Sequence, residues 1–310
     1  MSSNDIAEEE SRLMCCASCG IAELDDIELK PCDGCDLVRY CGDDCKEDHR
    51  PEHKEACKER AAELHDEILF RQPESSHMGD CPICCVPLPI DLRQSSFYSC
   101  CSKIICKGCA YANKLRQLQE NMPRICPFCR DPIPKTQEEI DKNFTKRIAV
   151  NDPVALFQFA KHNLYVLGQR GVRNNGDYDE AFKYLTKAAE LGNADAHFNL
   201  SHMYRDGGRV EKDEKKQVYH LEEAAIAGHL TARHNLGVYE GQNGRMERAG
   251  KHFIIAANLG YDLSMQMLKD GYKAGDISKE DYAATLRAHH AAIVATRSPQ
   301  RKEAEKAKYG

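Results

Sequence analysis

Residues Ala188–Leu200 read AAELGNADAHFNL, and the same order of residue types returns as AAIAGHLTARHNL from Ala224 and AANLGYDLSMQML from Ala256. The copies begin 36 and 32 residues apart. In each copy two alanines precede a glycine, a small residue follows the glycine after four positions, and a leucine follows after eight. Repeats of this length, with small side chains at fixed positions, are typical of closely packed helix pairs. The pattern therefore predicts a mainly α fold.

The repeats extend over residues 152–296, because Ala155, Phe159 and the stretch DYDEAFKYLTKAAELG from Asp177 supply an earlier unit. This pattern resembles the Sel-one-like repeat, a relative of the tetratricopeptide repeat. The resemblance implies an α-solenoid of helix pairs that carries no chemistry and binds a protein or peptide on its concave face.

The end of the repeat region is marked by SKEDYAATLRAHHAAIVA, in which Ser278 is placed to cap a helix and Asp281 to complete a capping box. Residues 297–310 form a charged tail, which we expect to be frayed.

Several histidines of this region invite a metal interpretation. We expect them to be packed or solvated instead, because no matched set of cysteines or carboxylates accompanies them and a structural zinc site needs four converging groups. The histidines concerned are His197, His202, His229, His234, His289 and His290.

The composition sets limits on the class of protein. The chain has 310 residues and a net charge of −6, and this acidic balance disfavours binding to a nucleic-acid backbone, which needs a basic face. No apolar stretch approaches the roughly 20 residues of a membrane-spanning helix. The start, MSSNDIAEEESRLMCC, is acidic and lacks the apolar core of a signal peptide. We therefore expect a cytoplasmic or nuclear protein without a membrane partner.

All 17 cysteines lie between Cys15 and Cys129. In a reducing compartment clustered cysteines are more often metal ligands than disulfides. Core packing explains a lone buried cysteine, and we expect it for Cys85, but it does not explain five C-x-x-C pairs. These pairs are Cys16/Cys19, Cys32/Cys35, Cys81/Cys84, Cys106/Cys109 and Cys126/Cys129.

The first cysteine cluster, residues 16–57, offers eight ligands, which is the number that two closed tetrahedral zinc sites require. They are Cys16, Cys19, Cys32, Cys35, Cys41, Cys45, His53 and Cys57. His53 is preferred over His49 because it lies four residues before Cys57, on the same face of a helix. We expect His49 to be an exposed residue on a charged face, and Cys16 is preferred over Cys15 because it keeps the C-x-x-C spacing.

This order of ligands resembles the MYND zinc finger, and we place such a finger at residues 14–58. The resemblance implies two interleaved zinc ions and a module that binds peptides, often peptides that contain proline. It assigns Cys16, Cys19, Cys41 and Cys45 to one ion, and Cys32, Cys35, His53 and Cys57 to the other. A helical linker is expected at residues 59–78.

The second cysteine cluster, Cys81–Cys129, resembles a RING finger, with CPIC at its start, C-x-x-C in the middle and CPFC at its end. We place it at residues 79–133, followed by a linker at 134–151. The resemblance implies cross-braced sites, one of which takes Cys81, Cys84, Cys106 and Cys109. Cys126 and Cys129 belong to the other.

The second of these sites lacks an obvious pair of ligands, because Lys103 stands where the family places a ligand and lysine has no usable lone pair near neutral pH. Three arrangements are open. Cys100 and Cys101 both bind, Cys101 binds alone with water or nothing completing the shell, or the site is empty. We favour the first because structural zinc sites are normally closed. The finger then holds two zinc ions, and otherwise one.

The resemblances imply two alternative functions. As a RING-type ubiquitin ligase the chain would position a charged ubiquitin-conjugating enzyme through Ile83, Pro127 and Arg130, while the repeats or the MYND-like finger select a substrate. As a scaffold it would only bring proteins or peptides together. We favour the scaffold slightly, and we expect two small cross-braced zinc fingers followed by an α-solenoid. No other catalytic motif is present.

Overall fold

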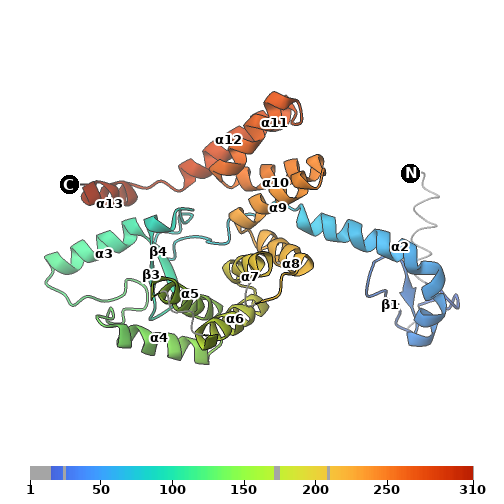
Figure 1. The fold of residues 1–310 in the computed structure, drawn as a ribbon, viewed down its shortest axis with the longest axis horizontal. Helices are drawn as coiled ribbons and strands as arrows, with labels where there is room; N and C mark the ends of the chain where they lie inside the picture. Colours follow the sequence, from blue (N-terminus) through green and yellow to red (C-terminus); the bar gives the residue numbers. More distant parts are fainter. Residues whose placement is uncertain (1–14, 24–25, 171–174, 208–209, 310) are drawn as a thin grey trace. The chain divides into compact units, whose positions relative to one another are not determined.

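The computed structural model describes residues 15–23, 26–170, 175–207 and 210–309. The acidic start and Met14, at the expected finger boundary, lie outside the described residues. Twelve α-helices and four short strands form in the described part of the chain (Figure 1), which confirms the mainly α prediction. The chain divides into two compact units, residues 1–71 and residues 72–310.

A membrane-spanning helix must be both long and apolar. None of the described helices combines the length and the apolar character that crossing a bilayer requires.

Unit 1 consists of a two-stranded sheet followed by one long helix. Strand β1 (Lys30–Pro31) pairs antiparallel with β2 (Arg39–Tyr40), and α2 (Asp43–Leu69) follows directly. Two aspartates in the first turn stabilise the helix, because their negative charges lie at the positive end of its dipole. The helix therefore begins inside the first cysteine cluster and continues without a break through most of the segment that we expected to be a separate helical linker.

The second cysteine cluster, in unit 2, is built on a hairpin. A short 3-10 turn, η1 (Leu92–Gln94), leads into β3 (Ser95–Tyr98), which pairs antiparallel with β4 (Lys103–Cys106), and α3 (Lys107–Gln119) follows. Because Tyr98 faces Lys103 across the hairpin, residues 99–102 form its turn.

The expected linker at residues 134–151 contains helix α4 (Gln137–Ala149), which begins with a capping box between Thr136 and Glu139. The buried Phe144 of this helix lies 6.0 Å from the ring of Phe97 in β3 and 6.0 Å from the ring of Phe159 in α5. This segment is therefore a packed helix that joins the second cysteine cluster to the repeats.

The repeat region is a series of antiparallel helices whose consecutive members pack together (Figure 1). They are α5 (Pro153–Arg170), α6 (Asn175–Glu190), α7 (Ala194–Asp206), α8 (Glu214–Ile226), α9 (Leu230–Gln242), α10 (Met246–Asn258), α11 (Asp262–Ala274) and α12 (Lys279–Ala295).

The repeated residues have the roles that their types suggest. Gly192, Gly228 and Gly260 all have positive φ, between 81° and 89°, directly after a helix, where a side chain would be strained. The small residues four positions later are fully buried, and so are the leucines eight positions later. These residues are Ala196, Ala232, Ser264, Leu200, Leu236 and Leu268.

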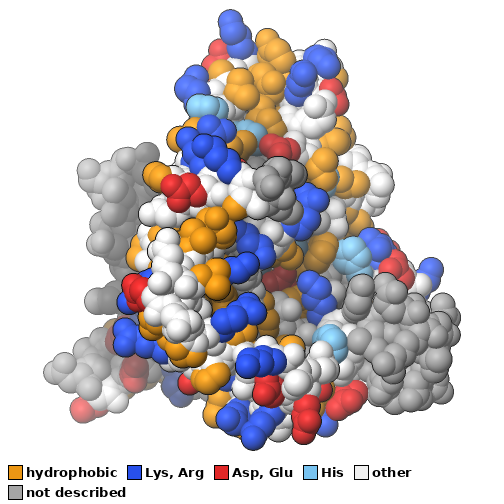
Figure 2. Space-filling view, turned by 90° about the vertical axis from the view of Figure 1, so that its left-hand side faces the viewer, with side chains coloured by type: hydrophobic (Ala, Val, Ile, Leu, Met, Phe, Trp, Pro, Cys, Tyr) orange, Lys and Arg blue, Asp and Glu red, His pale blue; other side chains and the backbone are white. Residues whose placement is uncertain are grey.

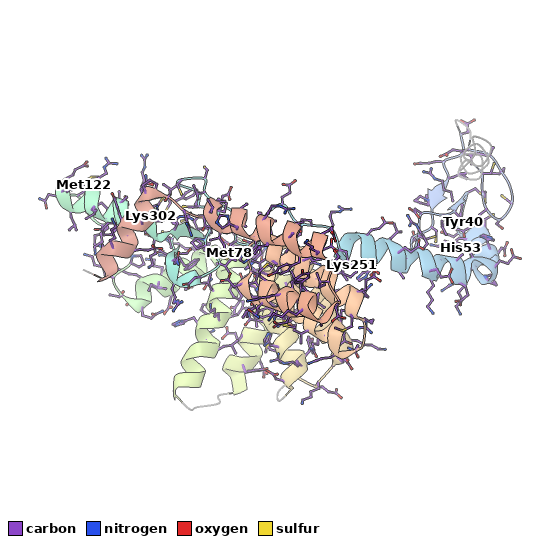
Figure 3. The ribbon with its side chains drawn as sticks, turned by 90° about the horizontal axis from the view of Figure 1, so that it is seen from above. Tyr40, His53, Met78, Met122, Lys251 and Lys302 are labelled. Atoms are coloured by element: carbon purple, nitrogen blue, oxygen red, sulfur yellow. The ribbon has the colours of Figure 1, made fainter. Side chains whose placement is uncertain are left out.

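The C-terminal segment differs from the prediction. The expected frayed tail forms helix α13 (Pro299–Tyr309), which packs against α3 of the second cysteine cluster. Figure 3 labels Lys302 on α13 and Met122 just beyond α3, and the two lie at the same end of unit 2. The prediction was wrong because it relied on the many charged residues of this segment. One of them, Arg301, is buried and anchors the helix.

Candidate zinc centres

The first centre joins the two ends of the first cysteine cluster. Cys41 Sγ lies 3.6 Å from Cys19 Sγ and 3.6 Å from Cys45 Sγ, and Cys16 completes a group of four converging sulfurs. Zinc at 2.3 Å from each of four thiolates gives a sulfur–sulfur separation of about 3.8 Å in a tetrahedron. Cys41 precedes α2 and Cys45 lies in its first turn, so the start of the helix holds this pair.

The second centre uses the following turns of α2. His53 and Cys57 lie on one face of this helix, and His53 Nε2 is 3.2 Å from Cys35 Sγ, while Cys57 Sγ is 3.7 Å from Cys32 Sγ. Burial raises the pKa of the Cys57 thiol to about 12. A cation at the centre would offset this cost, because zinc binds the thiolate form.

His49 does not have the exposed position that we expected. Its Nδ1 lies 3.0 Å from the hydroxyl of Tyr40, and its ring stacks on that of His53 at 5.6 Å. Figure 3 labels His53 on α2 and Tyr40 next to it. His49 is half-buried and supports the ring of the candidate ligand, a role that helical spacing alone did not reveal because Tyr40 comes from β2.

The third centre brings together Cys81, Cys84, Cys106 and Cys109, with 3.9 Å between Cys84 Sγ and Cys106 Sγ. The loop after Cys81 is held by a hydrogen bond from its backbone N–H to the carbonyl of Val86. Cys85 is exposed and has a φ of 53°, so our expectation of a core cysteine was wrong. The position belongs to the tight turn of the C-x-x-C loop, in which the residue after the second ligand adopts positive φ.

The fourth centre contains both neighbouring cysteines. Cys100 Sγ lies 3.4 Å from Cys129 Sγ, and Cys101 Sγ lies 3.9 Å from Cys126 Sγ. Both cysteines belong to the hairpin turn, where Ser102 has a φ of 55°. Such a conformation is uncommon for a residue other than glycine, and this turn lets two adjacent side chains reach one point.

Lys103 lies on the exposed start of β4, with its Nζ 5.7 Å from the centroid of the Phe128 ring. The ammonium group of Lys103 therefore makes a cation–π contact with this ring. Phe128 itself is 43% exposed and was not among the residues that we singled out, although it occupies the same place in CPFC as Ile83 does in CPIC.

Zinc fits all four groups. Each supplies four sulfur or imidazole ligands that lie within 4.8 Å of one another, and all 17 cysteines are free of disulfides. Structural zinc sites use these ligand types and take all four ligands from the protein. In the second cluster one group contains Cys81/Cys84 and Cys106/Cys109, and the other contains the two turn cysteines and Cys126/Cys129. The groups alternate along the chain, which is the cross-braced order that the RING resemblance implies.

The candidate partner-binding residues of the second cluster differ in exposure. Ile83 is 42% exposed. Arg130 is exposed and has a φ of 67°, and Pro127 is partly buried.

A fifth polar group connects the loop after α2 to the repeats. His77 Nε2 and His229 Nε2 lie 3.6 and 3.7 Å from Asp195 Oδ1, so His229 does have a carboxylate partner that we did not expect. Burial alone would raise the pKa of Asp195, but hydrogen bonding to His229 and His77 holds it well below its usual range.

This group differs from the zinc centres. The backbone N–H of Ala232 donates to His229 Nδ1, so the neutral ring carries its proton on Nε2, which faces the carboxylate. We therefore interpret the group as a polar contact within unit 2. The other repeat histidines are packed or exposed as expected, with His197 and His289 buried and His290 exposed. His289 nevertheless has a carboxylate partner that we did not expect, because its Nε2 lies 3.0 Å from Asp262 Oδ1.

Comparison with protein families identifies two kinds of module in this chain. Residues 16–57 match the MYND finger, and residues 153–193, 194–229 and 231–261 match the Sel1 repeat. The chain thus contains a MYND finger and three Sel1 repeats, which supports a zinc-binding protein that takes part in protein–protein interactions. A comparison with curated proteins found no match.

Solved structures similar to this chain include three bacterial proteins. A Sel1 repeat protein from Oxalobacter formigenes is 25% identical, with a TM-score of 0.41, and the match covers 52% of this chain and 66% of that one. A protective antigen of uropathogenic Escherichia coli that displays an SLR fold is 22% identical (TM-score 0.40; 51% and 34% covered). An immunity protein from Pseudomonas aeruginosa is 15% identical (TM-score 0.31; 61% and 84% covered).

Proposed function

We propose that this protein is a zinc-stabilised scaffold that binds peptide segments of partner proteins through its MYND finger and its helical repeats. The observation that carries the proposal is a pocket of about 270 Å³ formed by α7, α8 and α9. Three side-chain amides line it, those of Gln217, Asn235 and Gln242. An amide both donates and accepts hydrogen bonds, which suits the backbone of a bound peptide.

Other residues of the pocket give it a mixed character. Leu221 and Val238 supply apolar surface, while His202 and Arg205 supply polar atoms, and the Nη2 of Arg205 lies 3.1 Å from His202 Nδ1. A few fixed polar groups among apolar walls are typical of sites that recognise a short segment.

Selection of peptides from a random display library on the zinc-loaded chain tests this function. We expect enriched peptides whose affinity falls in the double variant Asn235→Ala, Gln242→Ala and stays unchanged in Gln266→Ala, which removes an exposed amide on α11. Hydrogen exchange should slow in α7–α9 when the peptide binds. Peptides that bind the double variant as tightly as the original chain would contradict a role for this pocket.

A second candidate function is that of a ubiquitin ligase. It is favoured by the exposure of Ile83 and Arg130 beside two cross-braced groups of ligands. Such a finger would position the conjugating enzyme and its bound ubiquitin without forming a covalent bond itself.

An auto-ubiquitination assay of the zinc-loaded chain with a panel of conjugating enzymes tests this candidate. Product should form with at least one enzyme and be reduced in Ile83→Ala and Arg130→Ala, while Leu118→Ala, which truncates a side chain that is 67% exposed on α3, should have no effect. Absence of product with every enzyme leaves the scaffold as the function.

A further inference from the structure

Helices α3 and α13 meet at a very short distance and form one wall of a cavity. A Cβ atom added at Gly108 would lie only 2.7 Å from the backbone nitrogen of Arg301. Beside this contact, α3, α13 and the β3 hairpin border a cavity of about 840 Å³. It is separate from the pocket on α7–α9, and no candidate zinc ligand lines it, although Arg301 and Lys107 adjoin the third centre. A volume of this size accommodates a peptide segment.

The cavity is positively charged. Five basic side chains line it, namely Arg93, Lys107, Lys114, Arg124 and Arg301, against two acidic ones, Asp91 and Glu305. Five positive and two negative charges give +3, whereas the whole chain has a net charge of −6. Figure 2 shows lysine and arginine side chains gathered among apolar ones on the face that carries α3 and α13.

Three of these basic groups are available to a ligand. Arg93 pairs with Asp91 at 2.9 Å, but in the described part of the chain no carboxylate lies within ion-pair distance of Lys107, Lys114 or Arg124. Each of these three side chains belongs to an exposed residue. An anion that enters the cavity therefore meets them without first breaking an ion pair.

Arg301 adds a buried positive charge. Only 6% of it is exposed, and its guanidinium donates to the carbonyls of Pro87 (2.7 Å) and Val86 (3.1 Å), with Cys84 Sγ 3.9 Å away. Its Nε–H is buried and has no hydrogen-bond partner among the described residues. These acceptors fix the guanidinium in the wall of the cavity, where its charge adds to that of the exposed lysines.

The arrangement of the cations favours an extended chain over a small anion. Lys107 and Lys114 are seven residues apart on α3, so they share a face at a separation of about 10 Å along the axis. In a peptide extended in the polyproline II conformation, residues i and i+3 lie on the same side of the chain and about 9 Å apart. The cavity also offers Tyr98, Tyr111 and Ile133 as surfaces for side chains between the charges.

We propose that the cavity between α3 and α13 binds an acidic, extended peptide segment of a partner protein, with two carboxylates three residues apart opposite Lys107 and Lys114. Nucleic acid is disfavoured as the ligand, because its phosphate backbone extends beyond the cavity over a chain with a net charge of −6, whereas a short peptide stays within the basic lining. The proposal does not depend on the pocket at α7–α9.

Fluorescence anisotropy with the zinc-loaded full chain tests the proposal. The probes are a labelled peptide with two glutamates three residues apart and the same peptide with glutamines in their place. The glutamate peptide should bind and the glutamine peptide should not. The double variant Lys107→Gln, Lys114→Gln should weaken binding about tenfold, as expected for the loss of two partly screened ion pairs.

Matched variants separate recognition from structure. Lys142→Gln with Lys146→Gln, two exposed lysines of α4, should leave the affinity unchanged. Because Lys107 adjoins Cys106, the variant Lys114→Gln with Arg124→Gln provides a second test, and the zinc content of every variant is measured.

Three outcomes would overturn the proposal. In the first, both peptides bind equally or both cavity variants keep full affinity. In the second, a single-stranded RNA oligonucleotide binds more tightly than the glutamate peptide and is lost in the same variants, which would assign a nucleic-acid site. In the third, inorganic phosphate displaces the peptide while chloride at equal ionic strength does not, which would assign a small-anion site.

Discussion

The first cysteine cluster and the helical repeats hold their folds by different means. Among the described residues, the buried apolar cluster of the former has Cys16, Leu29 and Tyr40 at its centre. In the repeats a single cluster contains nine buried residues, among them Leu185 and Leu200. So small an apolar core cannot offset the conformational entropy of the chain, and metal binding must supply the difference, whereas the repeats bury enough surface without a metal.

The second cysteine cluster lies between these two cases. It has two groups of candidate zinc ligands and a core that includes Leu88 and Ile105, and it also packs on the repeats through Phe97 and Phe144. The presence of zinc ligands alone therefore does not show how far a segment depends on metal, because packing on a neighbouring element also stabilises its fold.

Removal of zinc should have the largest effect and should separate the regions. A strong chelator is expected to unfold residues 16–57, since structural zinc contributes about 10–16 kcal/mol in small fingers, while α6–α11 remain folded. Hydrogen exchange measured by mass spectrometry, before and after chelation, checks this. Return of zinc serves as the control, and equal loss of protection in α9 and α10 would contradict the comparison.

Loss of a single ligand should have a more local effect. Cys100→Ser and Cys101→Ser are each expected to lose one zinc ion per chain, because the sulfurs of both residues face the Cys126/Cys129 pair, while Lys103→Ala loses none. Metal analysis by mass spectrometry gives the answer directly. Equal zinc content in all three variants would refute the arrangement in which neighbouring cysteines share one ion.

A cavity in the repeats should destabilise them without any change in zinc content. Leu200→Ala truncates a fully buried side chain and should lower the free energy of unfolding by about 2–5 kcal/mol. Leu191→Ala, at a position 45% exposed, is the matched control and should cost far less. Chemical denaturation of both variants measures the difference, and a loss of zinc in Leu200→Ala would show that the regions are coupled.

Acidification should weaken the repeats by a smaller and graded amount. Burial, with Arg233 and Arg248 nearby, lowers the pKa of His252 to about 3, compared with about 6.5 in an unfolded chain. The folded state therefore keeps this residue neutral, and its contribution is complete above pH 6.5 and falls by about 1.4 kcal/mol per pH unit below that.

Thermal unfolding between pH 7 and pH 5 checks the role of His252. The variant His252→Gln should show a shallower dependence on pH than the original chain, whereas His290→Gln, at an exposed position of α12, should show the same dependence. Identical slopes for all three proteins would mean that other groups cause the acid sensitivity.

Much of this architecture could be predicted from local spacing. Ligands such as His53 and Cys57 lie on one helical turn, and the glycines of the repeats end helices at fixed intervals, so a short stretch of sequence contains the whole signal. Packing of α13 could not be predicted in this way. It depends on Gly108 and Arg301, which are far apart in the chain and ordinary in their local context.

The same limit applies to the polar groups. The residues around Asp195 and His77 do not indicate that these two side chains meet. The contact of His49 with Tyr40 could not be foreseen from helical spacing either, because Tyr40 belongs to a strand. Lys107 and Lys114 become candidate ligand-binding residues only because α13 and the β3 hairpin complete a cavity around them.

The sequence by itself therefore determined the mainly α class, the repeat length and the candidate metal ligands, because each of these follows from spacing along a turn or a helix. Only the tertiary structure decided that Cys100 and Cys101 converge on the Cys126/Cys129 pair and that α13 borders a basic cavity. The physical reason is that such sites arise where distant segments meet, and the free energy of that packing is not contained in any one of them.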